Sequence, residues 1–115
     1  MSVIIWHNPR CSKSRQTLQL LKDRSIEPEI VEYLEHPPTE GTLREVLSLL
    51  GKTPRELMRS GETEFRDNDL ADPKLTDDEL ISAMVRIPRL IERPVVLANG
   101  KAAVGRPPES VLDIL

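Results

Sequence analysis

The sequence has little cysteine, few aromatic residues and no long hydrophobic run. Cys11 is the single cysteine among 115 residues, which excludes an internal disulfide framework. Three aromatic side chains are too few for the stacking platforms that bind single-stranded nucleic acids. No apolar stretch approaches the roughly 18 residues of a membrane span, and the N-terminus lacks a signal-peptide pattern. We therefore expect a cytoplasmic protein with neither membrane nor nucleic acid among its partners.

A strong charge of one sign is also lacking. The net charge of -3 gives no general attraction to polyanions, so any anion site must be local. One cysteine and two distant histidines are a poor set of metal ligands. We expect no metal and no tightly bound cofactor. A chain of 115 residues can bury a core as one domain, residues 1–115, and we expect a monomer.

The first third of the chain alternates between strand and helix patterns. Residues 3–6 are a β-branched and aromatic run typical of a buried strand. Residues 12–24 have the apolar spacing of a helix, and residues 29–34 alternate as a second strand. A strand, a helix and a strand this close together most simply form a right-handed parallel βαβ unit.

The middle of the chain contains three predicted helix starts. Each is a threonine followed three residues later by a glutamate, as in a capping box: Thr42 with Glu45, Thr53 with Glu56, and Thr76 with Glu79. Gly51 should end the first helix, the second should end near Arg59, and Pro88 should end the third. Residues 60–75 are polar and predict a loop. Together these signals indicate a helical insertion at about residues 40–90.

The last third of the chain predicts a hairpin and a closing helix. Residues 94–98 and 101–104 are two short strands around Asn99-Gly100, the strongest short-range hairpin signal. Residues 109–115 are long enough for one helix. The order βαβ, helices, ββα is that of a thioredoxin-like α/β fold with a helical insertion.

Cys11 falls at the predicted start of the first helix, and this position favours reactivity. Unpaired backbone N–H groups and the positive end of the helix dipole favour an anion there, and therefore a thiolate. His7, Lys13 and Arg15 lie close in sequence and add basic character. Ser14 stands where a C-x-x-C motif would place a second cysteine, so disulfide turnover at Cys11 needs an outside thiol. The pattern predicts a nucleophilic thiol beside an oxyanion site.

The sequence resembles the glutaredoxin-dependent arsenate reductases, especially their short members with an HNPRCSKSR motif. The resemblance extends essentially end to end and rests on four segments in order: His-Asn-Pro-x-Cys-x-x-Ser-Arg-x-Thr-Leu at 7–18, Glu-Leu-Met-Arg at 56–59, Glu-Arg-Pro-Val-Val at 92–96, and Gly-Arg-Pro-Pro-Glu at 105–109. It implies one thioredoxin-like arsenate reductase domain.

The resemblance also implies an activity and its residues. Cys11 would attack arsenate, and Arg59, Arg93 and Arg106 would hold the oxyanion. Glutathione would be the co-substrate, and a glutaredoxin would be the partner that clears the resulting mixed disulfide. A cis peptide is implied before Pro94. Guanidinium suits this task because it stays charged and offers paired N–H donors to two oxygens.

The residues assigned to thiolate stabilisation are His7, Ser14 and Arg15, and each has an ordinary alternative. His7 is equally explained as a partner of a backbone group, and Ser14 as a residue packed on the sheet. Arg15 is either an oxyanion ligand or a solvated helix residue. Arg59, placed at a helix end, is also explained by contacts with the last carbonyls.

Two other functions remain open. The same cysteine would serve a glutathione-linked thiol oxidoreductase or transferase that does not act on arsenate. Spx-type regulators share the fold and bind RNA polymerase, but they usually carry C-x-x-C, which Ser14 interrupts here. Ser12-Lys13 also replace the Gly-Thr that follows the cysteine in many arsenate reductases, and this difference leaves the oxyanion preference open.

Overall fold

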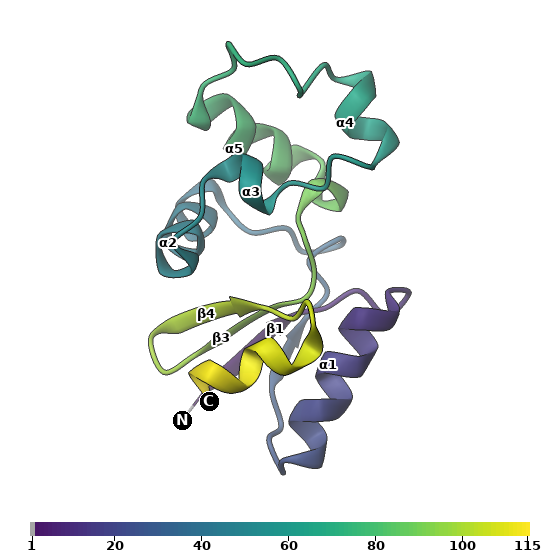
Figure 1. Ribbon diagram of the computed structural model, residues 1–115, viewed down its shortest axis with the longest axis vertical. Coiled ribbons are helices and arrows are strands. Elements are labelled where there is room, and N and C mark those ends of the chain that lie inside the picture. Colours follow the sequence, from purple (N-terminus) through teal and green to yellow (C-terminus); the bar gives the residue numbers. More distant parts are fainter. Residues whose placement is uncertain (1) are drawn as a thin grey trace. The chain divides into compact units, whose positions relative to one another are not determined.

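The computed structural model describes residues 2–115 and shows a mixed α/β chain. The chain divides into two compact units (Figure 1). The sheet unit consists of the chain up to His36 together with Arg93–Leu115, and the helical unit is Pro37–Glu92. The single-domain organisation with an insertion at about residues 40–90 stays a prediction. No helix within residues 2–115 is long and apolar enough to cross a membrane.

The sheet unit contains four strands in the order β2-β1-β3-β4. Strand β1 (Val3–Trp6) pairs in parallel with β2 (Glu29–Val31) and antiparallel with β3 (Val95–Ala98). Strand β3 pairs antiparallel with β4 (Lys101–Val104). The predicted parallel βαβ unit and the predicted hairpin are both confirmed.

The hairpin turn shows why its sequence was informative. Asn99 and Gly100 have φ values of 55° and 72°, in the left-handed region that a two-residue hairpin turn requires. Asparagine and glycine tolerate that region better than other residues. The Asn99 side chain also donates to the Ile114 carbonyl at 2.8 Å, which ties the turn to the end of the chain.

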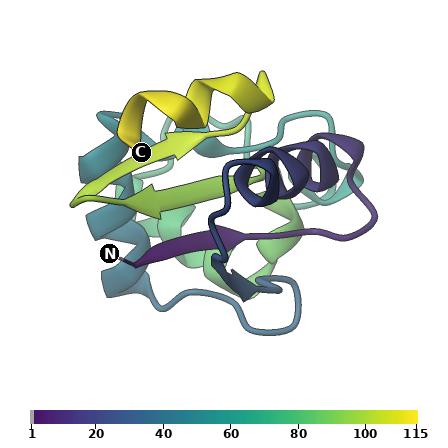
Figure 2. The ribbon, with the colours of Figure 1, turned by 90° about the horizontal axis from the view of Figure 1, so that it is seen from below.

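Helix α1 (Ser12–Asp23) and the 3-10 helix η2 (Pro108–Ile114) lie side by side over one face of the sheet (Figure 2). They form one apolar cluster with strands β1 and β3, whose members are Val3, Ile5, Leu21, Val96, Ala98, Val111 and Ile114. In α1 the buried positions are Ser14, Thr17 and Leu21, spaced three and four residues apart as one helix face requires. This packing fixes the start of α1 against the sheet.

Two sequence predictions in the sheet unit need correction. The strand predicted over residues 29–34 ends at Val31, because the N–H groups of Glu35 and His36 donate to the Glu32 carbonyl and form a turn. The closing helix is a 3-10 helix rather than an α-helix, and it begins at Pro108.

The helical unit consists of five short helices: α2 (Glu40–Leu50), α3 (Pro54–Leu57), α4 (Thr63–Asp67), α5 (Asp77–Arg86) and η1 (Pro88–Leu90). The capping boxes at Thr53 and Thr76 are confirmed, and Gly51 ends α2 in the left-handed conformation. The start of the first of these helices was predicted too late in the chain. Thr39 caps α2 by accepting from the Thr42 N–H at 3.1 Å, so Thr42 lies inside the first turn.

Two further predictions in this unit were wrong. Residues 60–75 contain helix α4 and are not only loop. Helix α3 ends at Leu57, so Arg59 does not end a helix. Instead Met58 pairs with Ile91 in an antiparallel bridge, and the Arg59 N–H donates to the Leu90 carbonyl at 2.8 Å. The backbone of Arg59 is therefore held by the segment that leads into Glu92.

Candidate active site

Cys11 is the N-cap residue of α1. Its backbone is extended, with φ of -95° and ψ of 123°, and its carbonyl accepts the first helical hydrogen bond, from the Arg15 N–H at 3.0 Å. Its own N–H donates to the Asn8 carbonyl at 3.0 Å, which closes the loop between β1 and α1. Only 7% of the residue is exposed. The strand-to-helix junction thus holds the sulfur at the open end of the helix.

The pKa of the Cys11 thiol lies below its ordinary value. Burial of the sulfur raises the pKa, but the backbone N–H of Ser14, the side chain of Arg93 and the backbone N–H of Lys13 lower it and outweigh burial. N–H groups in a first helical turn have no intrahelical carbonyl to bind, so their partial positive charge is available to the sulfur. A lowered pKa increases the fraction of thiolate, which is the nucleophilic form of cysteine.

Arg106 contacts the sulfur directly. Its Nη2 donates to Cys11 Sγ at 3.4 Å, and its Nε donates to the Arg93 carbonyl at 2.8 Å. The Arg106 guanidinium therefore links Cys11 to Arg93, whose side chain also lowers the pKa of the thiol. Two of the three predicted oxyanion arginines, Arg93 and Arg106, are thus gathered at Cys11 within the sheet unit.

Gly105 packs closely where these segments meet. Its N–H donates to the Pro94 carbonyl at 2.9 Å. A Cβ at Gly105 would lie 2.5 Å from Thr17 Oγ1 and 2.8 Å from Pro94 Cγ, distances that real side chains do not show. The cis peptide expected before Pro94 is confirmed, and a second, unpredicted cis peptide precedes Pro107. The glycine allows α1 and the segments bearing Arg93 and Arg106 to approach.

His7 and Ser14 form a buried pair behind the cysteine loop. His7 Nδ1 lies 2.6 Å from Ser14 Oγ, and the Asn8 N–H donates to the same oxygen at 3.0 Å. Burial of the imidazole lowers the pKa of His7, and this effect exceeds the opposing influence of Glu32. The neutral imidazole is therefore favoured. Any effect of His7 on Cys11 then passes through the placement of Ser14 and not through a histidine cation.

Arg15 is exposed and supports the loop backbone. Its Nη1 donates to the Pro9 carbonyl at 2.9 Å, and the neighbouring turn is closed by the Arg10 N–H on Asn8 Oδ1 at 3.0 Å. Its assignment to thiolate stabilisation stays a prediction. In the structure the Arg15 side chain binds the Pro9 carbonyl, in the loop that precedes Cys11.

Arg59 belongs to the helical unit, where two carboxylates bind it. Its Nε lies 3.0 Å from Glu62 Oε1, and its Nη1 lies 2.6 Å from Glu92 Oε1. The side chain is 22% exposed. Burial lowers the pKa of Arg59, but the hydrogen bonds and charges of Glu62 and Glu92 raise it overall, so the guanidinium is firmly cationic. Its role as a third oxyanion ligand stays a prediction.

Glu62, Glu92 and Gly105 were not among the site residues predicted from the sequence. Glu62 stands three residues after Arg59, a spacing at which side chains of opposite charge meet readily, and this was a usable signal for the Glu62 contact. Glu92 is 33 residues from Arg59, and no local pattern indicates that contact. The close packing at Gly105 could be recognised only once its neighbours in space were known.

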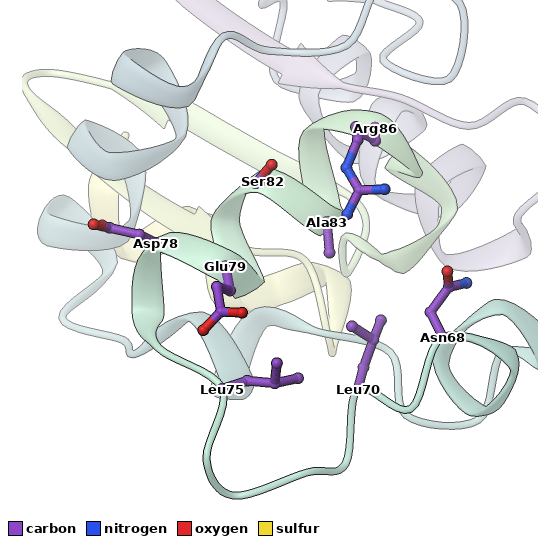
Figure 3. Close-up of a pocket in the computed structure, with 8 residues that line it drawn as sticks. All are labelled: Asn68, Leu70, Leu75, Asp78, Glu79, Ser82, Ala83 and Arg86. Atoms are coloured by element: carbon purple, nitrogen blue, oxygen red, sulfur yellow. The ribbon is translucent and has the colours of Figure 1, made fainter.

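A hollow of about 370 Å³ lies elsewhere in the helical unit (Figure 3). Figure 3 shows Glu79 and Arg86 of α5 along it, with Leu70 and Leu75 of the preceding loop beside them. It contains none of the residues assigned to the thiol chemistry. Within residues 2–115, no group of three or more His, Cys, Asp or Glu side chains is arranged to hold a metal ion.

Known proteins are similar to this chain over nearly its whole length. A family model described as the ArsC family matches residues 6–114. The chain is 56% identical over 114 residues to the Uncharacterized protein YfgD of Escherichia coli (strain K12), covering 98% of this chain and 96% of that protein. It is 46% identical over 112 residues to an arsenate reductase of Neisseria meningitidis serogroup A, covering 96% of each.

A solved structure gives the same fold. The arsenate reductase from Vibrio cholerae superposes with a TM-score of 0.97 and 48% sequence identity, covering 100% of this chain and 98% of that chain. The thioredoxin-like α/β fold expected from the sequence is confirmed.

Proposed function

Because the chain belongs to the ArsC family, we propose that it is an oxidoreductase that reduces arsenate to arsenite, with Cys11 as the nucleophile. The observation that carries this proposal is the Arg106 Nη2 contact at 3.4 Å from a thiol whose pKa is lowered. A thiolate that attacks an oxyanion approaches a like charge. Guanidinium groups beside the sulfur offset that repulsion and can bind two oxygens at once.

In the first step, the Cys11 thiolate attacks arsenic. A sulfur–arsenic bond forms, and one arsenate oxygen leaves as water after taking up protons. Arg93 and Arg106 would hold the remaining oxygens so that the leaving oxygen stays opposite the sulfur. Arg59 would contribute from the helical unit, as the family resemblance implies.

In the second step, the glutathione thiol attacks Cys11 Sγ. The sulfur–arsenic bond breaks, its electron pair goes to arsenic, and arsenite leaves. The two sulfurs are oxidised to a mixed disulfide as arsenic is reduced by two electrons. A glutaredoxin thiol would then take the glutathione and return Cys11 to the thiolate. Ser14 supports this external route, since it replaces the cysteine that would otherwise resolve the disulfide internally.

The supporting residues have proposed roles of their own. Ser14 would help position the thiolate, with His7 orienting its hydroxyl, and Arg15 would keep the Pro9 carbonyl in the loop conformation that exposes the helix start. The reaction needs a reducing compartment rich in glutathione, so we place it in the cytoplasm. We propose a monomer that needs no metal or bound cofactor.

The decisive experiment follows arsenite formation from arsenate with glutathione and a glutaredoxin present. Cys11→Ser should abolish turnover and retain the wild-type circular dichroism spectrum and melting curve. Mass spectrometry after arsenate exposure should show added mass on the Cys11 peptide of the wild-type protein alone. Arsenite formation by the Cys11→Ser protein would refute the mechanism.

A glutathione-linked transferase that ignores arsenate would use the same monothiol site. Glutathione turnover measured with and without arsenate separates the two, because only an arsenate reductase requires the oxyanion for thiol oxidation. Turnover on a glutathione mixed disulfide that arsenate leaves unchanged would favour the transferase.

A further inference from the structure

Arg59 is already satisfied by anions of its own unit. Glu62 accepts from Arg59 Nε at 3.0 Å, and Glu92 accepts from Arg59 Nη1 at 2.6 Å. The side chains of Arg59, Glu62 and Glu92 are only 22%, 17% and 28% exposed, respectively. The backbone fixes this geometry. Arg59 N–H donates to the Leu90 carbonyl, and Glu92 N–H donates to the Leu57 carbonyl at 2.9 Å.

Three carboxylates and a second arginine lie around Arg59. Glu62 Oε2 also lies 3.4 Å from Arg89 Nη2, and Arg89 Nη1 lies 3.5 Å from Glu64 Oε2. We call Arg59, Arg89, Glu62, Glu64 and Glu92 the Arg59 cluster. A multiply charged anion that reaches Arg59 would meet the carboxylates of Glu62 and Glu92 as well as the guanidinium.

Glu62 and Glu92 accept from Arg59 N–H donors of the kind that a bound oxyanion would also use. A guanidinium binds an oxyanion best through two parallel N–H donors. In Arg59 the Nε and Nη1 donors already serve carboxylates, so an oxyanion that binds this guanidinium lies close to those carboxylates. Binding there costs more for an anion of higher charge, since repulsion from the carboxylates scales with the charge they face.

We propose that Glu62 and Glu92 are specificity-determining residues that weaken the binding of doubly charged oxyanions by Arg59 relative to singly charged ones. This inference rests on the proposed function in one respect, which is that Arg59 takes part in oxyanion binding. It adds a selectivity by charge that a thiol and arginines do not themselves supply.

The test measures binding without chemistry. Calorimetry on the Cys11→Ser protein would give dissociation constants for arsenate, for sulfate and for perchlorate. Sulfate and perchlorate are both tetrahedral, but sulfate carries two negative charges and perchlorate carries one. Glu62→Gln and Glu92→Gln keep the side-chain shape and an acceptor oxygen but remove the charge. Each should tighten arsenate and sulfate binding about two- to fivefold and change perchlorate binding less, the scale of a partly exposed charge pair.

Glu64→Gln is the matched control. It removes the same charge from the same cluster, but Glu64 pairs with Arg89 and not with Arg59. Its effect on sulfate binding should be the smallest of the three. Adding Arg59→Gln to Glu92→Gln should erase the gain. Melting curves on each variant would establish that the helical unit is still folded.

Several results would overturn the proposal. Equal gains in all three glutamine variants would show a general charge effect, and weaker sulfate binding would show that the carboxylates position Arg59 for binding. A gain that persists without Arg59, or no measurable oxyanion binding in any variant, would also reject it. The proposed function has its own readout in arsenite formation by the cysteine-containing protein, so failure of turnover with the charge selectivity intact would refute only the function.

Discussion

Arg106 Nη2 lies 3.4 Å from Cys11 Sγ, although the two residues are 95 positions apart in the chain. The contact exists because β1, which leads to Cys11, pairs with β3, and β3 pairs with β4, which leads to Arg106. Because both pairings are antiparallel, β1 and β4 run in the same direction and their carboxyl ends lie at the same edge of the sheet. The thiol and the guanidinium meet there as a consequence of strand order.

Arg106→Lys should lower kcat/KM for arsenate by about tenfold or more. Lysine keeps the charge but cannot donate at once to Cys11 Sγ and to the Arg93 carbonyl, as the guanidinium does. Hydrogen bonds to charged groups contribute about 1.5–3 kcal/mol. The loss should fall on kcat as well as KM, because the contact is made to the reacting sulfur. Steady-state kinetics would measure both.

Arg66→Lys is the control for that substitution. Arg66 has an 81% exposed side chain, and its ion pair with Asp67 has a long separation of 3.8 Å. Its kinetics should match those of the wild type. Wild-type kinetics in Arg106→Lys would remove Arg106 from the proposed oxyanion site.

The Cys11 thiol should ionise below the range of a free cysteine, which is about 8.5. Alkylation rates followed against pH would give the midpoint. Arg93→Gln should move the midpoint upward, because burial still raises the pKa while one of the groups that lower it is gone. A midpoint in the wild type equal to that of an unfolded peptide would contradict the proposed thiolate.

The same shift fixes the sign of a stability change. The folded-state pKa lies below the unfolded value, so the unfolded chain holds the thiol proton more tightly. The stabilisation is complete above the unfolded pKa and is lost as pH falls through the folded pKa. Denaturant melts across that window should show a pH dependence in the wild type that Cys11→Ser lacks.

Gly105→Ala should disrupt the site without touching the reacting groups. The added Cβ would overlap Thr17 Oγ1 and Pro94 Cγ, so α1 and the neighbouring loop must separate, at a cost of about 1–3 kcal/mol for overpacking. Alkylation of Cys11 should also become slower at neutral pH, because the separation of α1 from the loop moves Arg93 and Arg106 relative to the sulfur. Denaturant melts and alkylation rates would measure the two effects.

Gly61→Ala provides the comparison. Apart from Gly61 and its two chain neighbours, no residue has an atom within 4 Å of a Cβ built at Gly61, so the free energy of unfolding should change by less than about 0.5 kcal/mol. Similar losses in both variants would mean that the close approach at Gly105 does not explain the result.

Local signals predicted the elements well where a single mechanism decides them. The Asn99-Gly100 turn and the capping box at Thr76 depend on a few adjacent residues, and both are present as predicted. Thr39 was missed as the cap of α2 because Thr42 offered the same side chain three residues later. The strand after Glu29 was predicted too long because its alternation continues into residues that a backbone turn takes over.

The candidate site was only partly readable from the sequence. Cys11 at a helix start is a local fact, so its reactivity could be argued from its neighbours. The contact of Arg59 with Glu92 could not be predicted, because it arises from the pairing of Met58 with Ile91. Likewise the crowding at Gly105 depends on Thr17 and on chain packing that no local pattern encodes.

Ser14→Ala should destabilise the sheet unit and alter the thiol. Ser14 Oγ is the partner of both His7 Nδ1 and the Asn8 N–H, and Ser14 is fully buried. A buried polar group left without a partner costs about 1–3 kcal/mol, so denaturant melts should show a loss of at least that size. Ser12→Ala, at an exposed position of the same helix, should cost much less. If the two variants melt alike, the buried pair does not support the cysteine loop. If Ser14→Ala is destabilised but its thiol alkylates at the wild-type rate, Ser14 has a structural role only.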